Sequence, residues 1–369
     1  MNFKIKRLKL LNALSKATKA VSIRSPLPVL TGIKFDLHED SLILTGSDSD
    51  ITIQTKIEKD DDLIIYQTGG VVLNSRYILD IVRKIDSDDI TIQIIDGALT
   101  RISGSNSKFD LNGTDVLDYP RIDLSKTGSK VLLNSLTLKD IISQTKFAAS
   151  DKEHKPILTG INFKAANNQL ECTATDSYRL AKRILTIDSD VSFNIIIPKK
   201  SLIEISRIIE KDEFIDLYVS DRKVLFIFDS VLIQTRLIDG SYPDTSRLIP
   251  HEHNYSMSVD SVSLLNSIDR ASLLSNEQTN IIKLSMSEDH VMLSSYSQEI
   301  GSVEENLSKA FYKGDELSIS FSAKYLNDAI KSINGEKVKV LFTGEMKPFI
   351  IMDFEKDDII QLVLPVRTY

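Results

Sequence analysis

The sequence predicts an α+β protein of three repeated domains, each with two helices packed on a mostly antiparallel sheet. A repeated segment is the first observation behind this prediction. PVLTGIKFDL at 28–37 returns as PILTGINFKA at 156–165, with six of ten residues identical. TGSDS at 45–49 and TATDS at 173–177 keep the same offset of 128 residues, so the match extends beyond one local segment.

A second set of segments sets the number of repeats at three. SRYILDIVRKI at 75–85, KSLIEISRII at 200–209 and KYLNDAIKSI at 324–333 each place apolar residues at helical spacing, with aligned residues 124 apart. Each repeat also has an earlier helical segment, expected at 6–21, 136–149 and 262–274. Alternating β-rich runs such as SLILTGSDSDITIQTKI at 41–57 supply the strands.

Turn-forming residues mark the boundaries between repeats. DYPRIDLSKTG near 118–128 and GSYPDTSRLIP at 240–250 both place Tyr-Pro just before the next repeat begins. We therefore expect domains at 1–126, 127–250 and 251–369.

The composition is that of an ordinary soluble globular protein, with 42% hydrophobic and 26% charged residues. The chain has no run of about 18 apolar residues, and its N-terminal segment lacks the apolar core of a secretory signal. We therefore expect a cytoplasmic protein without a membrane partner. The single cysteine, Cys172, excludes a disulfide framework and a multi-cysteine zinc site, and its setting favours a buried strand position.

Basic residues lie seven apart on the predicted helices, although the net charge is −7. Because seven residues make two helical turns, each pair is expected on the face away from the apolar stripe. Acidic residues concentrate in EKDDD at 58–62 and DSDD at 86–89, expected as loops between strands. The basic positions are Lys9 and Lys16, Arg76 and Arg83, Lys139 and Lys146, Lys200 and Arg207, Arg270, and Lys324 and Lys331.

This distribution of charge indicates a polyanion partner, because a basic surface in every repeat can neutralise phosphates without reading bases. No aromatic residues interleave the basic positions, which argues against stacking on single strands. No recognition-helix, zinc-finger or RNA-binding motif is present. The expected ligand is the backbone of double-stranded DNA, contacted without sequence preference. For any one helix, the alternative is an ordinary solvated face.

The sequence offers no catalytic constellation. It has no P-loop, G-x-S-x-G or H-E-x-x-H motif, and SDSDIT at 47–52 lacks the glycine and final glutamate of a calcium loop. His251 and His253 could present two imidazoles on one strand face, but no third ligand is evident. We therefore expect no catalytic residue, metal or cofactor. Two other classes stay open: an enzyme with an inter-domain pocket, and a monomeric scaffold.

Four segments carry a resemblance to a known family: RSPLPVLTGI at 24–33, TATDSYRLA at 173–181, YPDTSRLIP at 242–250 and LVLPVRTY at 362–369. With these segments the chain resembles, over its full length, the bacterial sliding clamps, the beta subunits of DNA polymerase III, in their low-GC Gram-positive form. The resemblance implies a homodimer that closes head to tail into a six-domain ring around duplex DNA. It also implies a processivity factor that tethers replicative DNA polymerase, and partners that include the clamp loader and other proteins with a clamp-binding motif.

The resemblance further implies an apolar cleft between the second and third domains that accepts short peptide tails. Leucines such as Leu180 and Leu248 are expected as anchors, with plain core packing as the alternative, and Arg179 is expected at a cationic rim. The matching positions are Leu158, Thr175, Ser177, Tyr178, Arg179, Leu180, Pro243, Arg247, Leu248, Tyr325, Pro348, Leu362, Leu364, Pro365, Val366 and Arg367.

Two more sets of residues follow from the resemblance. For DNA binding it adds Arg24 and the segment with Lys152, His154 and Lys155. At the subunit junction of the ring, it places Lys108, Phe109 and Leu111 of the first domain against Leu273 and Leu274 of the third.

Overall fold

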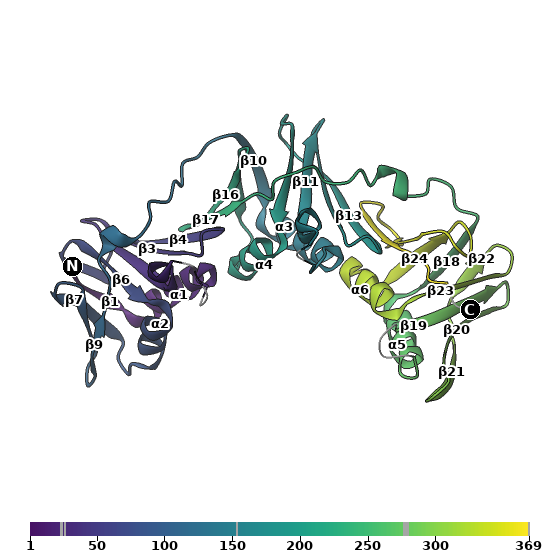
Figure 1. The fold of residues 1–369 in the computed structure, drawn as a ribbon, viewed down its shortest axis with the longest axis horizontal. Coiled ribbons are helices and arrows are strands. Elements are labelled where there is room, and N and C mark those ends of the chain that lie inside the picture. The colour runs from purple at the N-terminus through teal and green to yellow at the C-terminus, as the bar shows by residue number, and fades with distance from the viewer. Residues whose placement is uncertain (23–24, 26, 153, 276–279, 368–369) are drawn as a thin grey trace. The chain divides into compact units, whose positions relative to one another are not determined.

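The computed structural model describes residues 1–22, 25, 27–152, 154–275 and 280–367, and Figure 1 shows their helices and strands. The chain divides into two compact units. Unit 1 comprises Met1–Leu136 and Lys200–Leu237, and unit 2 comprises Thr137–Lys199 and Ile238–Tyr369. In the ranges that the structure describes, every helix is too short or too polar to cross a membrane.

Unit 1 contains two antiparallel sheets, A and B. Sheet A has the order β5 (Leu63–Gln67), β1 (Asn2–Lys6), β7 (Asp89–Asp96), β8 (Leu99–Ser103) and β9 (Lys108–Asn112). Sheet B has the order β10 (Ser129–Asn134), β15 (Phe214–Val219), β16 (Lys223–Phe228), β17 (Val231–Arg236), β4 (Ile51–Glu58), β3 (Ser41–Ser47), β2 (Gly32–Leu37) and β6 (Gly69–Asn74).

Unit 2 contains two further antiparallel sheets, C and D. Sheet C has the order β14 (Phe193–Pro198), β11 (Gly160–Ala166), β12 (Gln169–Thr175), β13 (Arg179–Thr186), β26 (Ile359–Val363), β25 (Phe349–Asp353), β24 (Lys337–Phe342), β18 (Tyr255–Asp260) and β22 (Phe311–Lys313). Sheet D has the order β21 (Gly301–Asn306), β20 (His290–Ser297), β19 (Ile281–Ser287) and β23 (Leu317–Ser322).

Each α-helix of the described ranges begins at the residue directly after a strand ends. Side chains at the strand ends help to start the helices: Asn74 Oδ1 accepts from the Tyr77 N–H at 3.3 Å, and Asp260 Oδ1 from the Ser263 N–H at 2.7 Å. The helices are α1 (Arg7–Ala17), α2 (Ser75–Lys84), α3 (Ser135–Thr145), α4 (Lys199–Ile208), α5 (Ser261–Ser272) and α6 (Ala323–Ile333).

The predicted helices are confirmed, but α1 and α3 are shorter than expected. The last parts of the segments predicted at 6–21 and 136–149 form the 3-10 turns Thr18–Ala20 and Lys146–Ala148. The helices also lie on two sheets rather than one: α1 contacts β1 of sheet A and both β3 and β4 of sheet B. The α+β class is confirmed, with a second sheet that the sequence pattern did not separate from the first.

Two of the sheets continue from one repeat into the next. β4 of the first repeat pairs with β17 of the second, with Ile53 opposite Ile233. β13 of the second repeat pairs with β26 of the third, with Leu180 opposite Leu362. Because backbone hydrogen bonds join neighbouring repeats, the compact units do not coincide with single repeats. The boundaries expected near 126 and 250 stay predictions.

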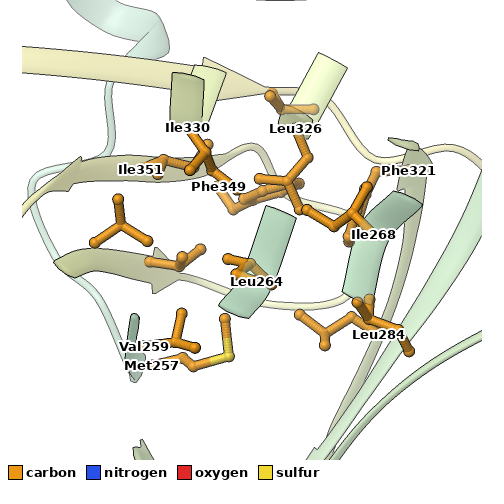
Figure 2. Packing of buried hydrophobic residues seen from close by; sticks show 14 of the residues in the cluster. Met257, Val259, Leu264, Ile268, Leu284, Phe321, Leu326, Ile330, Phe349 and Ile351 are labelled. Atoms are coloured by element: carbon orange, nitrogen blue, oxygen red, sulfur yellow. The ribbon is translucent and has the colours of Figure 1, made fainter. Parts of the chain in front are cut away.

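The core of the third repeat shows how the helices are held. Leu264 from α5 and Leu326 from α6 lie among buried side chains of both sheets, as Figure 2 shows. Phe349 of β25 is central to this core, with its ring centroid 5.1 Å from that of Phe321 and 5.4 Å from that of Phe342. Aromatic contacts of this kind add to the stabilisation from burial alone.

The tyrosine of each Tyr-Pro turn anchors the segment that follows a repeat. The buried Tyr119 hydroxyl donates to the Thr45 carbonyl oxygen at 3.4 Å, and the Tyr242 hydroxyl accepts from the Thr175 N–H at 2.9 Å. Burial raises the pKa of both phenols and keeps them protonated at neutral pH. Thr45 lies on β3 and Thr175 on β12, which are equivalent strands, so the Tyr-Pro repetition reflects a repeated anchor.

Replacing Tyr242 by phenylalanine should therefore destabilise the protein more than replacing Tyr119. Tyr242→Phe leaves the N–H of the buried Thr175 without its acceptor, at a cost of about 1–3 kcal/mol. Tyr119→Phe removes one long hydrogen bond, worth about 0.5–1.5 kcal/mol. Urea unfolding of both variants measures the difference, and an equal or reversed order would contradict the anchoring role of Tyr242.

Candidate nucleic-acid interface and peptide-binding cleft

The second helix of each repeat presents its basic pair to solvent. Two of these charges have acidic partners on the same helix. Arg83 Nη1 lies 3.4 Å from Asp80 Oδ1, and Arg207 Nη1 lies 2.6 Å from Glu204 Oε1. The expected orientation is confirmed for all three pairs, which are exposed: Arg76 and Arg83 on α2, Lys200 and Arg207 on α4, and Lys324 and Lys331 on α6.

The same expectation is wrong for the first helices of the first two repeats. The Lys9 and Lys16 side chains of α1 are only 28% and 15% exposed, and Lys139 and Lys146 are half-buried. Lys9 and Lys16 each stand one residue away from the buried positions Leu10 and Ala17, and one residue is 100° of helix rotation. They therefore flank the apolar stripe instead of opposing it. Arg270 on α5 is exposed as expected, at 54%.

The acidic segments do not lie apart from the basic ones, which corrects a second expectation. Asp60 of EKDDD forms an ion pair with Lys9. In DSDD, Asp89 Oδ1 lies 3.0 Å from Lys6 Nζ. Glu210 lies 3.4 Å from Lys16, within unit 1. These carboxylates neutralise charges that the linear sequence leaves unopposed. DSDD also follows helix α2 rather than a strand, since α2 ends at Lys84 and β7 begins at Asp89.

The DNA-binding residues suggested by resemblance are described in part. Lys152, His154 and Lys155 are exposed directly before the 3-10 turn Pro156–Thr159. Arg24 lies outside the described residues.

The predicted cleft draws on chain segments that lie side by side in unit 2. Arg179 pairs with Val363 where β13 meets β26. Beyond β26, the Leu364 N–H donates to the Tyr178 carbonyl at 3.0 Å, and the Val366 N–H donates to the Ser320 carbonyl at 2.7 Å. These hydrogen bonds bring the TATDSYRLA and LVLPVRTY segments together.

Burial divides the predicted cleft residues into two groups. Leu158, Leu180 and Leu362 are buried, at 6%, 1% and 3% exposed. The expectation that they belong to the peptide cleft stays a prediction. Thr175 is likewise buried. The accessible members are exposed (Ser177, Tyr178, Pro243, Arg247, Leu248, Arg367) or half-buried (Tyr325, Pro348, Leu364, Pro365, Val366).

Arg179 is a structural cation rather than the free rim charge that the sequence suggested. Its side chain is 10% exposed and lies within ion-pair distance of Asp176 and Asp328. The guanidinium also stands over the rings of Tyr325 and Phe147. Sequence reasoning missed Asp176, Asp328 and Phe147, because only their contacts with Arg179 in the folded chain identify them.

A pocket of about 450 Å³ in unit 2 adjoins the Arg179 contacts, since Asp328 and Phe147 both line it. Its lining includes Asp140 and Gln144 of α3, Asp328 and Lys331 of α6, and Asp353 of β25, and contains none of the predicted cleft residues.

The residues expected at the subunit junction lie on accessible surface. Lys108 and Phe109 are exposed on β9, the edge strand of sheet A, while Leu111 on the same strand is half-buried against the core. Leu273 directly follows α5 and is 75% exposed, and Leu274 is half-buried. An exposed apolar side chain beside an open sheet edge is suited to pairing with another chain.

Two smaller expectations are also resolved. Cys172 is buried in β12, where burial raises the pKa of its thiol, as expected for a core residue. His251 and His253 lie ahead of β18 rather than on a strand, so the strand placement was wrong.

Comparison with known proteins agrees with this architecture. The chain matches the DNA polymerase III beta subunit family, with the N-terminal domain over residues 1–123, the central domain over 132–244 and the C-terminal domain over 246–367. A beta sliding clamp from Staphylococcus aureus (strain Mu50) is 43% identical to this chain, with all of both chains covered.

Solved structures give the same result. A DNA polymerase sliding clamp from Bacillus subtilis matches with 41% identity and a TM-score of 0.97, over all of both chains. A DNA polymerase beta subunit from Streptococcus pyogenes matches with 32% identity and a TM-score of 0.96, again over all of both chains. The chain therefore belongs to the bacterial DNA polymerase III beta subunit family, the beta sliding clamps.

Proposed function

We propose that this protein is a DNA sliding clamp that acts in the cytoplasm as a processivity factor, not as an enzyme. Two chains close head to tail into a six-domain ring that encircles double-stranded DNA without sequence preference. The ring tethers replicative DNA polymerase, and its other partners are the clamp loader and further proteins with a clamp-binding motif.

One observation carries the DNA-binding part of the proposal. The same helix in all three repeats exposes two basic residues seven positions apart, in a chain of net charge −7. Charges on rigid helices can contact phosphates at any sequence. Weak and distributed contacts also suit a protein that must move along DNA, because each can break without a large barrier.

The accessible half of the predicted cleft supports the tethering part. Leu248, Tyr178 and Val366 offer apolar surface, and Arg247 and Arg367 are exposed beside them in the chain. A short tail that fills one or two apolar positions should bind at about micromolar affinity, near −8 kcal/mol. Two clefts in a ring add avidity.

Removing one exposed helical charge should weaken DNA binding uniformly. For Lys331→Ala we expect the slope of log affinity against log salt to flatten by at most about 0.9, equally for duplexes of unrelated sequence. Fluorescence anisotropy over a salt series measures this slope. Lys313→Ala is the matched control, since Lys313 is an exposed lysine on β22 and not on a helix. A changed sequence preference, or an equal effect of the control, would contradict backbone contact by the helices.

The experiment that tests the whole proposal compares retention on circular and linear DNA. Only a closed ring distinguishes a circle from a linear duplex of the same sequence.

A further inference from the structure

We propose that Asp328 is a positioning residue for the peptide-binding cleft: it fixes Arg179 and so keeps one wall of the cleft preformed before a client binds. This inference rests on the proposed function and deepens it. It assigns a role to a residue of α6 that is not among the predicted cleft residues.

The geometry around Arg179 leaves the guanidinium little freedom. Its Nε donates to Asp176 Oδ2 at 3.1 Å, and its Nη1 donates to Asp328 Oδ2 at 2.6 Å. The guanidinium carbon lies 4.4 Å from the Tyr325 ring centroid and 5.2 Å from the Phe147 ring centroid. Two carboxylates and two aromatic faces therefore hold one side chain that is only 10% exposed.

Arg179 in turn holds groups that belong to the predicted cleft. Its carbonyl accepts a hydrogen bond from the Thr175 hydroxyl at 2.6 Å, which closes the turn carrying Ser177 and Tyr178. The backbone of Tyr178 then accepts from the Leu364 N–H. Tyr325 packs on the guanidinium and is itself a predicted cleft residue. Loosening the Arg179 side chain would thus release the Tyr325 ring, beside the turn that carries Ser177 and Tyr178.

The repeats supply an internal comparison that separates function from folding. At the offset of 128, Arg179 corresponds to Ile51, which is 6% exposed at the start of β4. At the offset of 124, Asp328 corresponds to Glu204, which bonds Arg207 on its own helix.

Tyr325 corresponds to Ser201, whose hydroxyl accepts from Thr235 at 2.7 Å. Among the described residues, the pairing of β4 with β17 thus joins the first two repeats without an ion pair between the equivalents of Arg179 and Asp328, because Ile51 is uncharged and Glu204 pairs within its own helix. Since the fold does not require the Arg179 cluster, the cluster is specific to the junction that carries the predicted cleft.

The role of Asp328 predicts the sign of a mutational effect. If Asp328 preforms the wall, freeing Arg179 obliges the peptide to order it again, and affinity falls. If instead the peptide binds the Arg179 charge directly, removing a competing carboxylate strengthens binding. The two explanations therefore give opposite results for Asp328→Asn.

The experiment measures calorimetric binding of a short tail containing Gln and Leu or Phe to the full-length protein. We expect Asp328→Asn to weaken binding about tenfold, Asp328→Glu to restore most of it, and Asp140→Asn to have no effect. Asp140 is the matched control because it lines the same pocket as Asp328 from α3. In an Arg179→Met background, Asp328→Asn should cause no further loss, which a general structural defect would not reproduce.

Three outcomes would overturn the inference in different ways. Unchanged or tighter binding by Asp328→Asn would refute the positioning role while leaving the cleft in place. An equal loss for Asp140→Asn, or a further loss in the Arg179→Met background, would show that Asp328 acts through pocket stability. Failure of the wild-type protein to bind any tail would refute the proposed cleft itself.

Discussion

Replacing Leu273 and Leu274 together by alanine is expected to convert the dimer into folded monomers at low micromolar concentration. Burying a leucine contributes about 1.5–3 kcal/mol, and a two-fold ring contains the junction twice. Leu273 is 75% exposed in the single chain, so its truncation should weaken the association of the two chains without destabilising the fold of either. Sedimentation velocity measures the oligomer, and thermal unfolding shows that the monomer stays folded.

Leu117→Ala is the matched control for this experiment. Leu117 is 87% exposed on the 3-10 turn Val116–Asp118, so it undergoes the same chemical change outside the proposed junction. The control should remain dimeric. A dimeric double variant would place the junction elsewhere and remove Phe109 and Leu111 as its partners.

Deleting residues 365–369 is expected to abolish tail binding and leave the dimer intact. Leu364 and Val363 would remain, so β26 keeps its pairing with β13 and β25. The deletion removes the half-buried Pro365 and Val366, along with the Val366 hydrogen bond to Ser320. Starting from about micromolar affinity, we expect no measurable heat of binding by calorimetry.

Leu248→Ala tests the same cleft from an independent segment. Leu248 is 48% exposed on the 3-10 turn Ser246–Leu248, and its truncation should weaken tail binding by a factor of about ten. For the deletion of residues 365–369, a tail affinity equal to that of the wild type would mean that the C-terminal residues are only structural and that clients bind elsewhere.

The sequence predicts the fold well because its signals are local and repeated. Helical spacing in three aligned segments located α2, α4 and α6, and their exposed basic pairs followed from the same spacing. The continuation of sheets B and C between repeats was not predictable in this way. Pairings such as Ile53 with Ile233 join residues far apart in sequence, and alternation within one strand does not identify its partner.

Charge was the property that linear reasoning handled least well. Lys9 and Arg179 both belong to basic or polar motifs, but Asp60 and Asp328 reach them from distant segments. The burial of apolar residues was not predictable for a related reason: Leu180 and Leu248 are both leucines in family motifs, but Leu180 is buried and Leu248 is 48% exposed. Only three-dimensional contacts distinguish an ion pair from a free charge.

The most direct test of the clamp proposal is topological. The protein is loaded with its clamp loader onto a nicked circular plasmid, isolated by gel filtration, and divided into cut and uncut samples. We expect it to remain on the uncut circle in salt that screens direct contacts, and to leave within minutes once a restriction enzyme linearises the plasmid. Equal retention on circular and linear DNA, or equal loss from both, would contradict a closed ring that encircles duplex DNA.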